Sequence, residues 1–123
     1  MKNAINWFAI PATDINRAVK FFNAIFGFEM KVTNMEGTDM AFFPIQDQSG
    51  VGGHIFVSSK TKPTTDGPIL YLNGGDDLKN ILDLVESSGG KIITPKTQIT
   101  PEIGYMAIFT DTEGNKLALH SPK

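Results

Sequence analysis

A helix-forming segment that occurs twice constrains this chain most strongly. The segment from Asp14 to Gly27 places apolar residues along one face of a helix, with an acidic residue before it and a glycine after it. The same pattern returns 63 residues later, where Asp77 and Gly90 stand in place of these two end residues. The matched apolar positions are Ile15, Ala18, Val19 and Phe22 in the first copy and Leu78, Ile81, Leu82 and Val85 in the second. A shared register and matching ends favour duplication over a chance likeness of two amphipathic helices.

Each copy is predicted to be a strand, a helix and three further strands. In the first copy the strands are Ala4 to Ile10, ended by Pro11, then Glu29 to Thr33, Thr38 to Ile45 and Gly52 to Ser58. In the second copy they are Ile69 to Asn73, Lys91 to Thr94 with a continuation toward Ile99 left open, Tyr105 to Thr110 and Lys116 to His120, and the helix spans Asp77 to Ser87. The polar segment between the copies carries two prolines and a glycine, which is typical of a linker.

Neither copy has enough apolar surface on its own to cover a sheet, so the two are expected to share one. The predicted fold class is therefore α+β, with two tandem βαβββ modules that form a curved mixed sheet, a cup, with the helices outside. We expect one domain over residues 1–123, with module one at about 4–58, a linker at about 59–68 and module two at about 69–121.

Composition narrows the function classes. The net charge is −2 and the pI about 5.6, so the chain lacks the basic balance that nucleic acids and anionic membranes require of a partner. The chain contains no cysteine, which excludes disulfides, thiolate metal sites and cysteine nucleophiles. No apolar run approaches the 18 residues or so of a membrane span. A cytoplasmic protein without nucleic-acid or membrane partners is expected.

Several short motifs, in their order and spacing, resemble those of the vicinal oxygen chelate superfamily, which holds glyoxalase I, bleomycin- and fosfomycin-resistance proteins and extradiol dioxygenases. The motifs are Trp7 to Pro11 leading into Asp14-Ile15, Phe22 to Gly27, Gly50 to Gly53, and Asp111 to Asn115. The closing segment, Leu117 to Ser121, looks like a glyoxalase-like subgroup. The resemblance covers the whole chain and implies the same cup-shaped fold, but one fold hosts many reactions.

In the proteins that this chain resembles, four inward-facing sheet positions bind a divalent metal, usually through His, Glu or Gln. Carried over from the helix ends and from the glycines at 50 and 114, these positions fall on Trp7, Leu70, His54 and Ala118. Only His54 is a competent ligand, and a catalytic metal site normally needs three. No cofactor is therefore expected. The alternative is a divalent metal held at an unconventional site by His54 and His120 with a carboxylate or water, although a strand-end histidine such as His120 is more simply fixed by a backbone group.

The expected ligand-binding residues are Trp7, His54, Phe43, Phe56 and Tyr105. Trp7, the only tryptophan, is either a core residue or the wall of an apolar pocket, as tryptophan serves in the drug-sequestering proteins that the chain resembles. The aromatics either line the cup or lie beneath the helices, because strand alternation separates two faces without telling which is which.

Three functions remain in competition. The first is a protein that binds a small, aromatic or oxygenated ligand in the cup without a conventional metal site. The second is a metal-dependent lyase, isomerase or dioxygenase of the glyoxalase type. The third is a partner-binding module that serves oligomerisation. Because open cups leave sheet edges that proteins usually cover, a homodimer is expected, with cups formed within one chain or by modules paired across chains.

Overall fold

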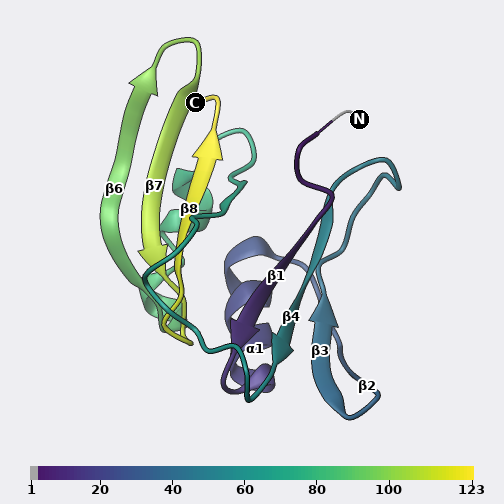
Figure 1. The fold of residues 1–123 in the computed structure, drawn as a ribbon. Coiled ribbons are helices and arrows are strands. Elements are labelled where there is room, and N and C mark those ends of the chain that lie inside the picture. The colour runs from purple at the N-terminus through teal and green to yellow at the C-terminus, as the bar shows by residue number, and fades with distance from the viewer. Residues whose placement is uncertain (1–2) are drawn as a thin grey trace.

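The computed structural model describes residues 3–123 and contains two four-stranded mixed sheets (Figure 1). The strand order is β1-β4-β3-β2 in the first sheet and β5-β8-β7-β6 in the second, so each module repeats the same topology. The first strand of each module pairs in parallel with the last, and the other pairings are antiparallel. The predicted pair of βαβββ modules in the α+β class is confirmed.

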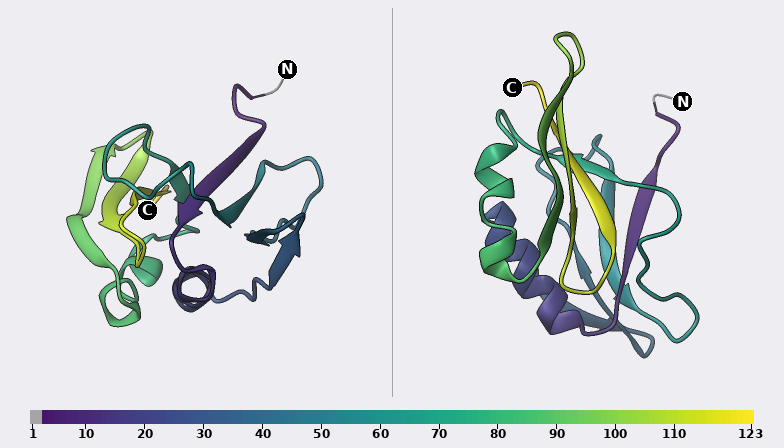
Figure 2. Two further views of the ribbon diagram at one scale, coloured as in Figure 1. Left: turned by 60° about the horizontal axis from the view of Figure 1, so that its bottom comes forward. Right: turned by 90° about the vertical axis from the view of Figure 1, so that its left-hand side faces the viewer.

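The elements follow the predicted order. Module one contains β1 (Trp7–Ala12), α1 (Ile15–Phe26), β2 (Val32–Met35), β3 (Thr38–Phe42) and β4 (Gly52–Val57). Module two contains β5 (Tyr71–Asn73), α2 (Lys79–Leu82), a short 3₁₀ turn (Glu86–Ser88), β6 (Lys91–Thr100), β7 (Gly104–Thr110) and β8 (Lys116–Ser121). The helices of both modules lie on the same side of the strands (Figure 2).

Helix α1 is the largest single contributor to the core. Its apolar stripe is buried at Ile15, Ala18, Val19, Phe21, Phe22 and Ile25. Asp14 caps the first turn by accepting a hydrogen bond from the Arg17 backbone N–H at 3.1 Å, which satisfies a donor that the helix itself leaves free. Gly27 ends the helix in the left-handed conformation, with φ 71° and its N–H bonded to the Asn23 carbonyl.

Several boundaries differ from those expected. Strand β1 continues through Pro11 to Ala12, because β1 is an edge strand and the Pro11 carbonyl points away from β4, toward Asn115. The missing Pro11 N–H therefore costs no ladder hydrogen bond. The second helix is only four residues long, and after Asp83 its backbone bonds tighten to the i−3 pattern in a segment that ends in two serines and two glycines. Strand β6 extends to Thr100 and carries three register shifts, one of which spans Pro95.

Strands β2 and β3 form a hairpin whose first strand begins later, and whose second strand ends sooner, than the sequence predicted. Their two-residue turn is Glu36-Gly37, both with positive φ (55° and 83°), as a type I′ turn requires. The segment expected to start β2 instead lies against α1, because the Asn23 side chain accepts the Met30 N–H at 2.7 Å.

Apolar and polar contacts join the modules. The ring of Phe21 on α1 packs 6.2 Å from that of Phe109 on β7, and both side chains are buried. The second contact is polar: Glu113, in the turn before β8, accepts hydrogen bonds from the backbone N–H groups of Thr13 and Asp14 and from the guanidinium of Arg17. A carboxylate from module two thus sits at the positive N-terminal end of the helix of module one.

The residues beside this carboxylate complete the junction. Asp111 accepts three backbone N–H bonds of its own turn, and the Asn115 side chain donates both to Asp111 and to the Pro11 carbonyl. Burial raises the pKa of Asp111, although these hydrogen bonds act against the rise. Burial also acts to raise the pKa of Glu113, but its bonds from Arg17, Asp14, Thr13 and Thr112 outweigh burial and hold the pKa below its usual range.

Among residues 3–123, no helix is both long and apolar enough to cross a membrane.

Replacing Glu113 with Gln should lower the free energy of unfolding by about 2 kcal/mol at neutral pH, because several charge-assisted hydrogen bonds to one carboxylate are weakened together. A carboxyl whose folded pKa is depressed contributes stability above its unfolded pKa and loses it as the pH falls through the folded value. The difference between wild type and Glu113→Gln should therefore shrink below about pH 4, as measured by urea unfolding across the pH range. Glu102→Gln, in the exposed β6–β7 turn, is the matched control; an equal loss there would contradict the assignment.

Candidate functional site

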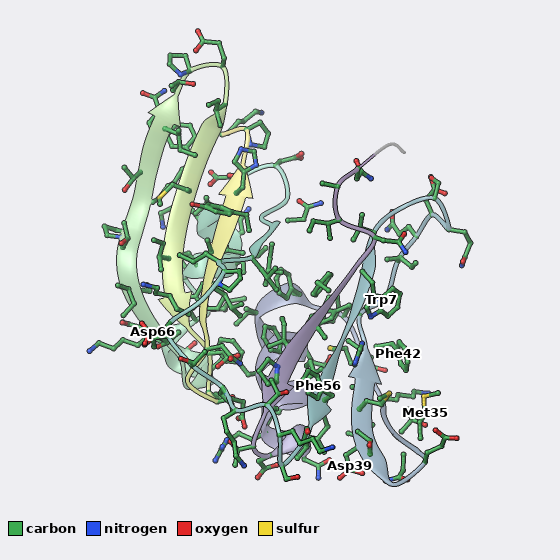
Figure 3. The ribbon with its side chains drawn as sticks, in the orientation of Figure 1. Trp7, Met35, Asp39, Phe42, Phe56 and Asp66 are labelled. Carbon is green, nitrogen blue, oxygen red and sulfur yellow. The ribbon has the colours of Figure 1, made fainter. Side chains whose placement is uncertain are left out.

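The face of the first sheet that points away from α1 carries a group of aromatic side chains. Ile10 on β1, Ala41 on β3 and Ile55 on β4 are buried on the helix side, so their strand neighbours point the other way. We call this the open face. Its pairing in register brings Ala9, His54 and Phe42 side by side across β1, β4 and β3. Trp7 lies two residues before Ala9 on β1, and Phe56 lies two residues after His54 on β4, so both are on the same face (Figure 3).

Trp7 can lie across β4 because its partner there is a glycine. A Cβ atom built on Gly52 would come within 2.8 Å of Cζ3 of the Trp7 ring. On the opposite face, a Cβ on Gly53 would meet the Phe8 ring at 2.4 Å. The Gly52-Gly53 pair therefore allows close approach of two aromatic rings from β1, one on each face of the sheet. Glycine within a strand often marks such a close approach.

The indole then reaches the next open-face residue of β4. Trp7 Nε1 lies 2.8 Å from His54 Nδ1, and because an indole N–H can only donate, Nδ1 must be the acceptor. The His54 ring is therefore neutral in this arrangement. Burial lowers the pKa of His54 from its ordinary value, because a partly desolvated imidazole resists taking up a charge. Hydrogen bond and burial thus favour the same protonation state.

Two phenylalanines surround this pair. The Phe42 ring is 6.1 Å from Trp7 and 5.7 Å from His54, and the Phe56 ring is 5.7 Å from His54. Trp7 is 47% exposed and Phe42 41%, so the group is open on its outer side. We call these four residues, Trp7, Phe42, His54 and Phe56, the aromatic cluster. The alternative placement of Trp7 in the core does not hold, because its ring lies on the open face and reaches the surface.

The structure separates two other expected residues from this cluster. Phe43 lies on the helix side of the first sheet, where its ring packs against Phe8 and Phe22 at 5.3 and 5.4 Å. Tyr105 belongs to the second sheet, is partly buried against the core and lies beneath the ammonium of Lys96 at 4.6 Å. Phe42, which the sequence reasoning missed, takes the place of Phe43. The burial of Ala41 assigns its neighbours on both sides to the outer face, but alternation in the sequence alone carried no signal for this choice.

A groove of about 330 Å³ adjoins the cluster along the free edge of β1. Trp7 and Ile5 lie along it on the β1 side, and the segment 61–66 lies across from them. Asn115 and Pro11, which are joined by the hydrogen bond between the modules, also line the groove. Its charged lining residues are Lys62, Lys116 and Asp66. Trp7 is thus shared between the aromatic cluster and the groove.

The two histidines are engaged separately. His120 Nε2 lies 2.6 Å from the carbonyl oxygen of Ile103, so the expectation that a backbone group fixes this strand-end histidine is met. Within residues 3–123, no three side chains of His, Cys, Asp or Glu converge in a way that could hold a metal ion. Of the other expected ligand positions, Ala118 pairs with Tyr71 in the second sheet, and Leu70 lines the groove.

The model of the Glyoxalase/Bleomycin resistance protein/Dioxygenase superfamily matches residues 4–119 of this chain. The chain belongs to this superfamily. It is also 31% identical over 123 residues to a glyoxylase-like domain-containing protein from Didymella fabae, a match that covers 94% of this chain and 91% of the relative.

Solved structures share the fold at low sequence identity. A glyoxalase-related enzyme from Fulvimarina pelagi is 14% identical with a TM-score of 0.72, covering 98% of this chain and 88% of that one. A mutant of the genomically encoded fosfomycin resistance protein from Listeria monocytogenes, complexed with Mn(II) and a dihydroxypropylphosphonic acid, is 15% identical with a TM-score of 0.70. That match covers 100% of this chain and 95% of that one.

The metal that the superfamily implies does not fit the residues of this chain. Trp7, Leu70 and Ala118 offer no ligand atom suited to a divalent metal. The remaining position, His54, already uses Nδ1 to accept the indole N–H. A metal at Nδ1 would have to displace that bond and would find no second side chain among the other three positions.

Replacing Gly52 with Ala should break the bond between Trp7 and His54, because the added methyl group occupies the space of the indole ring. The single indole N–H resonance in the proton–nitrogen NMR spectrum should move to the position of a water-exposed indole. Val51→Ala, at the preceding exposed residue, is the control and should leave the resonance in place. An unchanged resonance in Gly52→Ala would contradict this geometry.

Proposed function

We propose that this protein binds a small aromatic or oxygenated molecule on the open face of its first sheet, without a conventional metal site. The observation that carries the proposal is the exposure of Trp7 within the aromatic cluster and beside the groove. Flat aromatic side chains around one polar group are typical of small-molecule sites, since stacking and burial provide affinity and the polar group provides orientation.

The surroundings of Trp7 support a binding role over a packing role. An indole that only filled the core would gain from complete burial, whereas this one keeps about half of its surface in water. The residue beneath it, Gly52, has no side chain, and this absence allows the indole ring to lie across the sheet. A ligand that covers the exposed part of Trp7 and Phe42 would remove apolar surface from water, which is favourable by roughly 25 cal/mol per Å² of apolar area.

The ligand-binding proposal predicts that small aromatic or oxygenated compounds change the fluorescence of Trp7 saturably. Since Trp7 is the only tryptophan, all of the tryptophan emission comes from this site. Trp7→Phe should fold normally, because the ring reaches the surface, and should bind the same compounds roughly tenfold more weakly by calorimetry. Tyr71→Phe, on the second sheet, is the matched control. The proposal fails if no compound in such a screen perturbs Trp7, or if Trp7→Phe binds as tightly as wild type.

The alternative is a metal-dependent lyase, isomerase or dioxygenase of the glyoxalase type. The superfamily contains enzymes by name, and the fosfomycin resistance protein of the same fold is complexed with Mn(II). Elemental analysis of the purified protein separates the two functions. About one equivalent of a transition metal that disappears in His54→Ala would favour the enzyme and would overturn the metal-free site.

We further propose that the chain forms a homodimer. Support comes from the edges of β2 and β6, the outer strands of the two sheets, and from exposed apolar side chains on both sheets, which a second copy would cover. These side chains include Val32 and Met35 on β2 and Ile93 and Ile99 on β6.

Light scattering is expected to give twice the mass of one chain. Met35→Lys or Ile93→Lys should shift the equilibrium toward the monomer, because a buried lysine without a partner is costly. Lys31→Met, which removes a charge beside the same strand, is the opposite control. A single chain at high protein concentration would contradict the dimer and would also remove the purely oligomerising role from consideration.

A further inference from the structure

We propose that His54 is a hydrogen-bond donor that determines the specificity of this site, so that the site takes a planar aromatic molecule bearing a hydrogen-bond-accepting oxygen, such as a carbonyl or carboxylate. The inference rests on the proposed function and adds to it the polar group that the ligand must carry. It follows from which nitrogen of His54 holds the proton.

The hydrogen bond with Trp7 determines the tautomer. The indole nitrogen has a proton to donate and no lone pair to offer, so the Nδ1 atom of His54 must present a lone pair at 2.8 Å. A neutral imidazole carries a single N–H, which must then be on Nε2. Trp7 thus makes His54 a fixed donor at Nε2, as a hydrogen bond to one ring nitrogen of a histidine sets the role of the other.

The Nε2 atom is available to a ligand. Within residues 3–123 it makes no hydrogen bond, whereas Nε2 of His120 is bonded to a carbonyl. No buried side-chain nitrogen or oxygen of the described chain lacks a partner, so an unbonded atom of this half-buried ring has to reach the surface. A ligand acceptor can therefore replace water at Nε2 without any rearrangement of the cluster.

The neighbours of His54 offer no acceptor of their own. Across the open face it is flanked by Ala9 on β1 and Phe42 on β3, and along β4 by Gly52 and Phe56. None of these side chains carries a charge, and His54 takes part in no ion pair within the described chain. The adjoining groove adds two lysines, Lys62 and Lys116, and one aspartate, Asp66. This arrangement complements a ligand with an oxygen acceptor, but not a ligand that can only donate hydrogen bonds or that is positively charged.

Four probes with the same phenyl ring test the inference: acetophenone, benzoate, ethylbenzene and benzylammonium. Binding is followed through the indole N–H resonance of Trp7 in the intact protein. Acetophenone and benzoate should bind about fivefold to tenfold more tightly than ethylbenzene, the ratio expected for one hydrogen bond. Benzylammonium should bind most weakly, because its ammonium would face an N–H donor.

Two variants locate the effect. His54→Phe keeps a ring at the position and removes the donor, so acetophenone and ethylbenzene should then bind within about twofold of each other. The matched control is His120→Gln on the second sheet, which should retain the wild-type ratio. Side-chain nitrogen NMR of His54 should also place the proton on Nε2 at neutral pH, and Trp7→Phe should remove this preference.

The outcomes separate the two claims. If the probes bind without discriminating between acetophenone and ethylbenzene, or if benzylammonium binds best, the donor role is wrong while the aromatic site stands. If none of the probes perturbs Trp7, both the donor role and the proposed function fall. A His54 ring with its proton on Nδ1, or charged at neutral pH, overturns the donor role whatever the probes do.

Discussion

Burial of the apolar stripe of α1 is the constraint on which the rest of this structure depends. The helix covers the inner face of the first sheet, and Phe21 also contacts Phe109 of the second sheet, so one helix contributes to both halves of the core. Because apolar residues of β1, β3 and β4 must face this helix, the alternate residues of the same strands are forced to the outer face. The aromatic cluster therefore follows from the core: Phe42, His54 and Phe56 stand one position away from Ala41 or Ile55, and Trp7 stands three positions before Ile10.

The polar junction at Glu113 complements this apolar contact. A carboxylate whose side chain is shielded from water accepts from the first backbone amides of α1 and from Arg17, whose own side chain remains half exposed. Such an arrangement compensates for the loss of hydration through several directed bonds. It also fixes the end of β1 against the second module, because Asn115 of the same turn donates to the Pro11 carbonyl.

The sequence predicted the fold well because the fold depends on features that repeat. Helix register, end residues and strand order all recur at a nearly constant spacing, and the duplicated topology follows from them. Prediction was weaker wherever a tertiary contact determines a strand boundary or the direction of a side chain. Pro11 remains within β1 only because that strand is an edge, and the expected start of β2 is instead held against α1 by Asn23. For the site, Trp7, His54 and Phe56 are brought together, but Phe43 was expected in place of Phe42. A one-residue choice of face cannot be made by alternation alone, and the hydrogen bond from Trp7 to His54 has no signature in sequence spacing.

The paired glycines of β4 have a consequence for how this protein can change. At each glycine, an aromatic ring of β1 occupies the space where a side chain would stand. Trp7 does so at Gly52 on the outer face, and Phe8 does so at Gly53 on the inner face. The packing on the two faces of the sheet is therefore independent. The outer pair, Trp7 and Gly52, can be replaced without changing the space available to the inner pair, Phe8 and Gly53. A smaller residue at position 7 would leave empty space above Gly52, and a residue with a side chain could then be accommodated at position 52. Recognition at this surface can accordingly diverge through two linked substitutions while the scaffold beneath keeps its shape.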